Sequence, residues 1–62
     1  MNVIQVGYGY WGANLVKKLL ASPKFKLIAV CETEPVRRQK AREDIPAEVA
    51  VTDDYTRFLS SV

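Results

Sequence analysis

The sequence predicts an α/β fold, the Rossmann-like βαβαβ half of a doubly wound parallel sheet with strand order 3-2-1. Three observations predict it. Short apolar segments alternate with segments of helical periodicity, the connections are too long for hairpins, and a glycine-rich turn joins the first strand to the first helix. Right-handed crossovers then place the second strand between the other two. With no linker or internal repeat, we expect residues 1–62 to form one partial domain.

The first half of the chain predicts a strand, a helix and a second strand. The β-branched run of residues 2–6 ends abruptly at a glycine, as a strand does where it enters a tight turn. Residues 10–21 predict an amphipathic helix. Its apolar positions at helical spacing are Trp11, Leu15, Val16, Leu19 and Leu20. Ser22-Pro23 ends this helix, and the apolar centre of residues 25–31 indicates a strand buried between two layers.

The second half repeats the alternation. Thr33-Glu34-Pro35 provides a possible cap and a proline in the first turn of a helix that runs to about Asp44. Ile45-Pro46 ends it, and residues 48–52 predict a third short strand. A last helix is expected after that strand. Asp53 or Asp54 can cap it, and its apolar residues are Tyr55, Phe58 and Leu59.

The composition limits the classes of function. Hydrophobic residues make up 48% and charged residues 26% of the chain, which is typical of a globular protein. A net charge of +2 is too near neutrality to indicate a nucleic acid or a membrane as partner. Cys31 is the only cysteine and histidine is absent, so we predict neither an internal disulfide nor a metal site. A reduced, cytoplasmic setting is expected, with no signal peptide or membrane span.

The stretch VGYGYWGAN, residues 6–14, carries the pattern G-x-G-x-x-G between the first strand and the first helix. In a dinucleotide-binding turn Gly7 permits the tight turn, Gly9 lets a pyrophosphate approach the backbone, and Gly12 lets the helix pack closely on the strand. The N–H groups around Gly9, Tyr10 and Trp11 would bind the phosphates, aided by the helix dipole. Alone the pattern is a weak signal, since three glycines also occur in turns that only relieve backbone strain.

An acidic residue at the predicted end of the second strand strengthens that signal. Glu32 lies 20 positions after Gly12, where a dinucleotide site needs a carboxylate to accept hydrogen bonds from the adenosine ribose. We therefore include Glu32, the adjacent Thr33 and Arg37 among the cofactor-binding residues. A carboxylate there repels a 2′-phosphate, which favours NAD over NADP. NADP stays possible because Arg37 and Arg38 begin the next helix and can reach such a phosphate, although an exposed helix face usually carries solvated arginines.

The aromatic residues of the loop have three possible roles. Tyr8, Tyr10 and Trp11 can form a lid over the first helical turn, line the edge of a cofactor, or pack against a neighbouring element. Packing in a core or an interface is favoured for Trp11. Cys31 borders the predicted adenosine pocket, where a small buried apolar residue is favoured over a reactive thiol.

With VGYGYWGAN and LIAVCETEPVRR in place, the chain resembles the N-terminal domain of the glucose-fructose oxidoreductase, inositol dehydrogenase and MocA-like family of NAD(P)-dependent oxidoreductases. The likeness extends through VTDDYTRFL, which is similar to the third strand and third helix of that family. Ala13 stands where the family usually has proline, and Glu32 where aspartate is more frequent.

The resemblance implies hydride transfer to or from a sugar or cyclitol carbon in the full-length enzyme. The family's catalytic Glu-Lys-Pro motif and its substrate-binding domain have no counterpart in these 62 residues. We therefore assign no catalytic residue and expect the chain by itself to be inactive.

Other functions stay open at this stage. One is a non-catalytic module that senses NAD or another nucleotide through the same loop. Another is a structural fragment that self-associates, because the edge of residues 2–6 would present unpaired backbone groups, and a homo-oligomer through that edge is expected. Nucleic-acid binding through residues 37–42 is disfavoured, since that basic face has no interleaved aromatic residues and acidic residues offset its charge.

Overall fold

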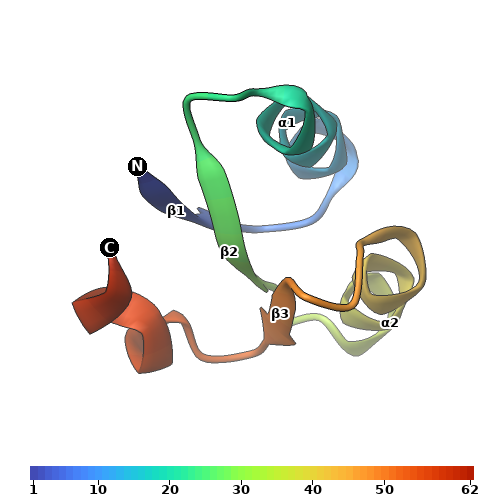
Figure 1. Cartoon of the computed structure of the whole chain (residues 1–62). Helices are drawn as coiled ribbons and strands as arrows, with labels where there is room; N and C mark the ends of the chain where they lie inside the picture. Colours follow the sequence, from blue (N-terminus) through green and yellow to red (C-terminus); the bar gives the residue numbers. More distant parts are fainter.

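The computed structural model describes all 62 residues as a three-stranded parallel sheet flanked by helices (Figure 1). The α/β class expected from the sequence is confirmed. The elements in chain order are β1 (Asn2–Val6), α1 (Tyr10–Ala21), β2 (Lys26–Cys31), α2 (Pro35–Asp44), β3 (Ala50–Thr52) and the 3-10 helix η1 (Tyr55–Ser61). None of the helices has the length and apolar character needed to cross a membrane.

The sheet has the order β1-β2-β3, and both strand pairs are parallel. Its strands therefore have the same neighbours as in the expected order 3-2-1, read from the opposite edge. Helices α1 and α2 lie on one side of the sheet, and η1 lies on the other (Figure 1). On that second side η1 contacts β1 and β2, and Asn2 Nδ2 donates a hydrogen bond to the Ser61 carbonyl (3.1 Å). The chain thus changes sides after β3 and returns toward β1.

The helices and β2 enclose the core. Its buried residues are Tyr8, Val16, Leu27, Val30, Ala41, Ile45 and Val49. Strand β2 carries one residue more than β1 over the paired segment, because Val3 pairs with Leu27 while Ile4 pairs with Ala29. This irregularity allows Leu27 and Val30, three positions apart, to join one apolar cluster.

Helix α1 buries only part of the apolar stripe that was expected, and it partly buries Ala13 in addition. Val16 is 2% exposed, and Ala13 and Leu19 pack against the same cluster. Trp11 is 77% exposed and Leu15 49%, so the prediction that Trp11 packs in the core is wrong. A helix turns about 100° per residue, which places Trp11 about 140° away from Val16 and therefore outside the interface with the sheet.

Two strands are shorter than predicted. Strand β2 begins at Lys26 rather than at position 25, and β3 covers 50–52 rather than 48–52. Only Ala29–Cys31 of β2 face β3, and the Val49 N–H instead donates to the Pro46 carbonyl in the preceding turn. The third strand is short because that turn uses the backbone groups that a longer strand would need.

The caps of α2 and η1 are acidic residues that the sequence allowed. Glu34 caps α2, its carboxylate accepting from the Arg37 N–H (2.8 Å). Asp54, rather than Asp53, caps the last helix and accepts from the Thr56 N–H (3.0 Å). The hydrogen bond from the Thr56 hydroxyl, followed by that from the Thr56 N–H, lowers the pKa of Asp54. That helix is 3-10 throughout and has no buried residue.

The outer edge of β1 has no strand partner. Met1 and Gly7, which flank the strand, make backbone hydrogen bonds to β2. Because alternate residues of a strand face the same neighbour, Asn2, Ile4 and Val6 direct their N–H and C=O groups away from β2. These groups are arranged symmetrically about Ile4, so a second copy of the chain can pair with them in antiparallel orientation.

We expect the chain to self-associate through this edge as its concentration rises. Val6 is 62% exposed at this edge, and a lysine in its place would replace an apolar side chain by a charged one, which disfavours pairing of an edge strand with another chain. Val6→Lys should raise the dimer dissociation constant in sedimentation equilibrium by about tenfold or more, about 1.4 kcal/mol. The control Val36→Lys adds the same charge to an exposed position on α2 and should change it little. A monomer at every concentration, or equal effects of both variants, would contradict this expectation.

Candidate functional site

The turn after β1 depends on a glycine backbone. Gly7 has φ of 97°, a conformation that residues with a side chain rarely adopt, and its N–H donates to the Cys31 carbonyl (2.7 Å). This hydrogen bond continues the pairing of β1 with β2 into the turn. The ends of the two strands are therefore held together where the glycine loop begins.

Helix α1 starts in direct contact with that turn. A Cβ at Gly12 would overlap the Gly7 carbonyl group, approaching its carbon to 2.9 Å. The Gly7 oxygen also accepts a hydrogen bond from Gln5 Nε2 (3.3 Å), so it is fixed from a second side. Only glycine at position 12 permits the helix to begin this close to the strand.

The first turn of α1 has backbone donors without a protein acceptor. Gly9 caps the helix and provides no side-chain hydrogen bond, and the first N–H of the turn to be paired is that of Ala13, which donates to the Gly9 carbonyl (2.9 Å). The N–H groups of Tyr10, Trp11 and Gly12 make no hydrogen bond. Such donors, together with the positive end of the helix dipole, favour an anionic ligand.

Glu32 lies beside the loop, but its carboxylate is turned into the protein. The residue follows β2 directly and is 6% exposed. One carboxylate oxygen accepts from the Tyr8 N–H (2.6 Å) and the other from the Glu34 N–H (2.9 Å). The bonds from Glu34 and then Tyr8 lower the pKa of Glu32, with a smaller contribution from the charge of Arg37. Glu32 therefore joins the glycine loop to the loop that precedes α2.

The other predicted residues after β2 lie around Glu32 and the two loops that its carboxylate joins. The Arg37 guanidinium lies close to Gly9, 3.9 Å from where a Cβ on that glycine would be. Arg38 points elsewhere, because its Nη1 donates to the carbonyls of Glu32 and Thr33 (3.2 Å each). Thr33 itself is exposed. The structure thus brings Glu32 and Arg37 to the glycine loop and uses Arg38 to hold the neighbouring backbone.

Tyr8 is a structural anchor that the sequence left undecided. Its ring is buried in the core, and its hydroxyl donates to Asp44 Oδ2 (3.0 Å). Burial, followed by the hydrogen bond to Asp44 and the charge of that residue, raises the pKa of Tyr8 to about 12. The bonds from Lys40 and Tyr8 lower the pKa of Asp44. A negative charge in the last turn of a helix is unfavourable, because it lies at the negative end of the helix dipole. The position of Asp44 in the sequence could therefore have indicated that its carboxylate has hydrogen-bond donors of its own.

Tyr10 and Trp11 do not take part in the core. Their rings meet edge to face, with centroids 5.4 Å apart and planes at 80°, and each is 77% exposed. Their side chains therefore stand beside the free N–H groups of the loop and face solvent. Packing of Trp11 in an interface stays a prediction. Cys31 is free and buried, as expected of a small apolar residue.

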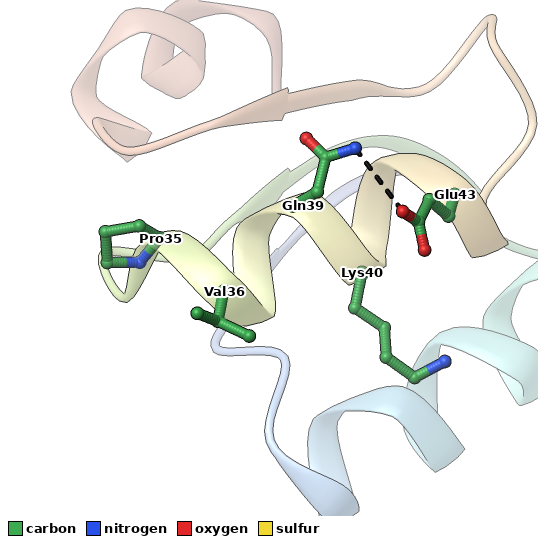
Figure 2. A pocket seen from close by; sticks show the side chains of 5 residues that line it. All are labelled: Pro35, Val36, Gln39, Lys40 and Glu43. Atoms are coloured by element: carbon green, nitrogen blue, oxygen red, sulfur yellow. Dashed lines mark hydrogen bonds between the residues drawn. The ribbon is translucent and has the colours of Figure 1, made fainter.

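Three hollows lie near α2, and the smallest of them, of about 330 Å³, is lined by Tyr8, Val16, Lys17, Leu20, Lys40, Asp44 and Ile45. A cleft of about 390 Å³ between α1 and α2 opens beside the glycine loop and includes Gly9 and Arg37 in its lining. The third, of about 400 Å³, is lined by α2 alone (Figure 2). Because it has walls from a single helix, it is a surface groove. No group of three or more acidic or cysteine side chains is placed to hold a metal ion.

We compared the chain with protein-family models, with curated protein sequences and with solved structures, and none of them matches it. The resemblance to the oxidoreductase family therefore rests on the quoted sequence motifs. A function is accordingly inferred from the loop and from the side chains around it.

Gly12→Ala should destabilise the fold, because the added Cβ overlaps the Gly7 carbonyl. We expect the free energy of unfolding to fall by about 1–3 kcal/mol, as for other overpacked sites. Gly9→Ser is the matched control, since a Cβ there meets only the end of the Arg37 side chain and serine is a good helix cap. It should change stability by no more than about 0.5 kcal/mol in urea denaturation. Equal losses in both variants would show that the contact with Gly7 is not the cause.

Glu32→Gln should destabilise the protein at neutral pH by about 1–3 kcal/mol, because an amide offers one acceptor oxygen to two backbone donors. The folded pKa of Glu32 is below its ordinary value of 4.5, so its contribution is present above that pH and is lost as the pH falls toward the folded pKa. The stability difference between wild type and variant should therefore shrink in acid. Asp44 and Asp54 titrate in both proteins and cancel from the difference. A difference independent of pH would contradict the assignment.

Proposed function

We propose that the chain binds the adenosine diphosphate part of NAD(P), as the nucleotide-binding part of an oxidoreductase. The glycine loop carries this proposal. Gly7 has the positive φ of the tight turn, Gly12 contacts the turn where no side chain fits, and the N–H groups after Gly9 have no protein acceptor. These are the separate tasks that the three glycines perform in a dinucleotide-binding turn.

The sheet supports the assignment of these elements to half of a doubly wound Rossmann domain. Strand β2 is central, α1 and α2 share one face, and η1 lies on the other face and returns toward β1. Ligands of such folds bind at the carboxyl ends of the parallel strands. The glycine loop follows the carboxyl end of β1, and Glu32 follows that of β2.

The residues present fit the phosphate end of such a cofactor better than its ribose. The backbone of Gly9, Tyr10 and Trp11 would hold the pyrophosphate. Thr33 is exposed and would lie near the ribose, whereas Glu32 is buried and bonded to two backbone N–H groups. Each Glu32 oxygen keeps a lone pair for one further donor, so a ribose hydroxyl would share the carboxylate with the protein.

The oxidoreductase part of the proposal comes from the resemblance to the sugar and cyclitol dehydrogenases. In that family the bound nicotinamide supplies or accepts a hydride at a substrate carbon. Within this chain, the proposed tasks are to bind the adenosine end and to orient the pyrophosphate. No residue of the chain is assigned to the acid-base chemistry.

Calorimetry of the chain with ADP, ADP-ribose, NAD and adenosine tests this function. The chain should bind ADP with a dissociation constant on the order of 1 mM, about −4 kcal/mol, and should bind adenosine much more weakly. Gly9→Val should remove ADP binding, since its side chain occupies the approach of the pyrophosphate, while the thermal unfolding transition is retained.

The matched control is Ala21→Val, which places the same side chain at the exposed far end of α1. It should bind ADP as the wild type does. ADP binding no tighter than adenosine, or unchanged in Gly9→Val, would show that the loop is not a phosphate site.

A further inference from the structure

The smallest hollow near α2, which we call the Ile45 hollow, lies between α1 and the carboxyl-terminal half of α2. Its volume is about 330 Å³, near the lower end of the roughly 300–1,000 Å³ that is usual for small-molecule sites. Its floor is apolar, because Tyr8 and Ile45 are 7% exposed and Val16 is 2% exposed. Leu20 of α1 is 42% exposed and adds an apolar wall. The hollow can therefore receive a compact apolar group.

Charged side chains from both helices line the same hollow. Lys40 and Asp44 lie one turn apart on α2, and the Lys40 ammonium is 3.1 Å from Asp44 Oδ2. Figure 2 shows Lys40 extending from α2 toward α1, on the side away from Gln39. Lys17 approaches from α1 and forms no ion pair. Two ammonium groups thus accompany one carboxylate above the apolar floor.

The charges of these groups at neutral pH follow from their contacts. Hydrogen bonds from Lys40 and from the Tyr8 hydroxyl lower the pKa of Asp44, which is therefore ionised. Burial, followed by the hydrogen bond to Asp44 and its charge, raises the pKa of Tyr8 to about 12, so its hydroxyl stays neutral. The hollow consequently has one positive charge in excess. A ligand with a single negative charge would balance it, whereas a dianion would exceed it.

We propose that the Ile45 hollow binds a small monocarboxylate with a compact apolar chain, its carboxylate between Lys17 and Lys40. The chain would lie on Val16, Leu20 and Ile45. A lysine ammonium has three donors, so Lys40 can keep its bond to Asp44 and donate to the ligand as well. This site is separate from the proposed nucleotide site, since none of the three glycines of the loop lines the hollow.

A titration followed by NMR, with the ¹⁵N-labelled chain at low ionic strength, tests the ligand class. The compound to use is 3-methylbutanoate, which should bind with a dissociation constant on the order of 1–10 mM. Its largest shift changes should fall on residues that line the hollow. Acetate should bind about tenfold more weakly, because it lacks the carbons that would lie on the apolar floor. The neutral 3-methylbutanamide should also bind about tenfold more weakly, because it has no charge for the two lysines.

Variants test the two halves of the site separately. Lys17→Gln should weaken the binding of 3-methylbutanoate about fivefold or more. Lys18→Gln removes the same charge from the next position of α1, which is exposed and does not line the hollow, and should bind as the wild type does. Leu20→Asn should weaken the binding of 3-methylbutanoate and leave that of acetate within about twofold. Lys17 and Leu20 are both exposed, so these variants should keep the fold, which the same spectra report.

The competing location for a carboxylate is the start of α1, with its free N–H groups. Gly9→Val should therefore retain the binding of 3-methylbutanoate. Loss of binding in Gly9→Val would place the ligand at the loop and overturn the proposal. Equal affinity for acetate or for the amide, or equal losses in Lys17→Gln and Lys18→Gln, would also overturn it.

Discussion

The site is organised around the buried carboxylate of Glu32. A charge that is 6% exposed is costly unless hydrogen bonds satisfy it, and here the donors are backbone N–H groups of the two loops that leave the sheet. The bond to Tyr8 fixes the loop after β1, and the bond to Glu34 fixes the loop after β2. The start of α1 and the start of α2 are therefore positioned relative to each other through one side chain. A residue expected to contact a ligand is in this structure a connection within the protein.

Much of the fold could be predicted from the sequence, because apolar periodicity and glycine chemistry act locally. The bounds of α1 and the need for glycine at positions 7 and 12 follow from such patterns. The failures depend on tertiary contacts. Trp11 belongs to the apolar face of an isolated helix, but the line of contact with the sheet runs through Val16. The length of β3 depends on how much of β2 faces it, which periodicity does not reveal.

In the site, too, local patterns were predictable and tertiary contacts were not. The positions of the glycines and of Glu32 were predictable, since the spacing along the chain sets the ends of adjacent parallel strands side by side. The direction of the Glu32 carboxylate was not, because it depends on which backbone donors lie within reach after folding. Tyr8 was one of three aromatic residues with no distinguishing signal in the sequence, and only its burial beside Asp44 identifies it as an anchor.

These contacts make the loop rigid on one side and open on the other. Tyr8 is held at both ends, by its N–H on Glu32 and its hydroxyl on Asp44, and Gly7 is held by Cys31. The N–H groups that follow Gly9 have no such partners. A ligand anion that accepts from them would meet donors whose positions are already fixed, so little conformational entropy would be lost on binding. The acids near the loop serve to fix it, and the charge available to a ligand is consequently positive.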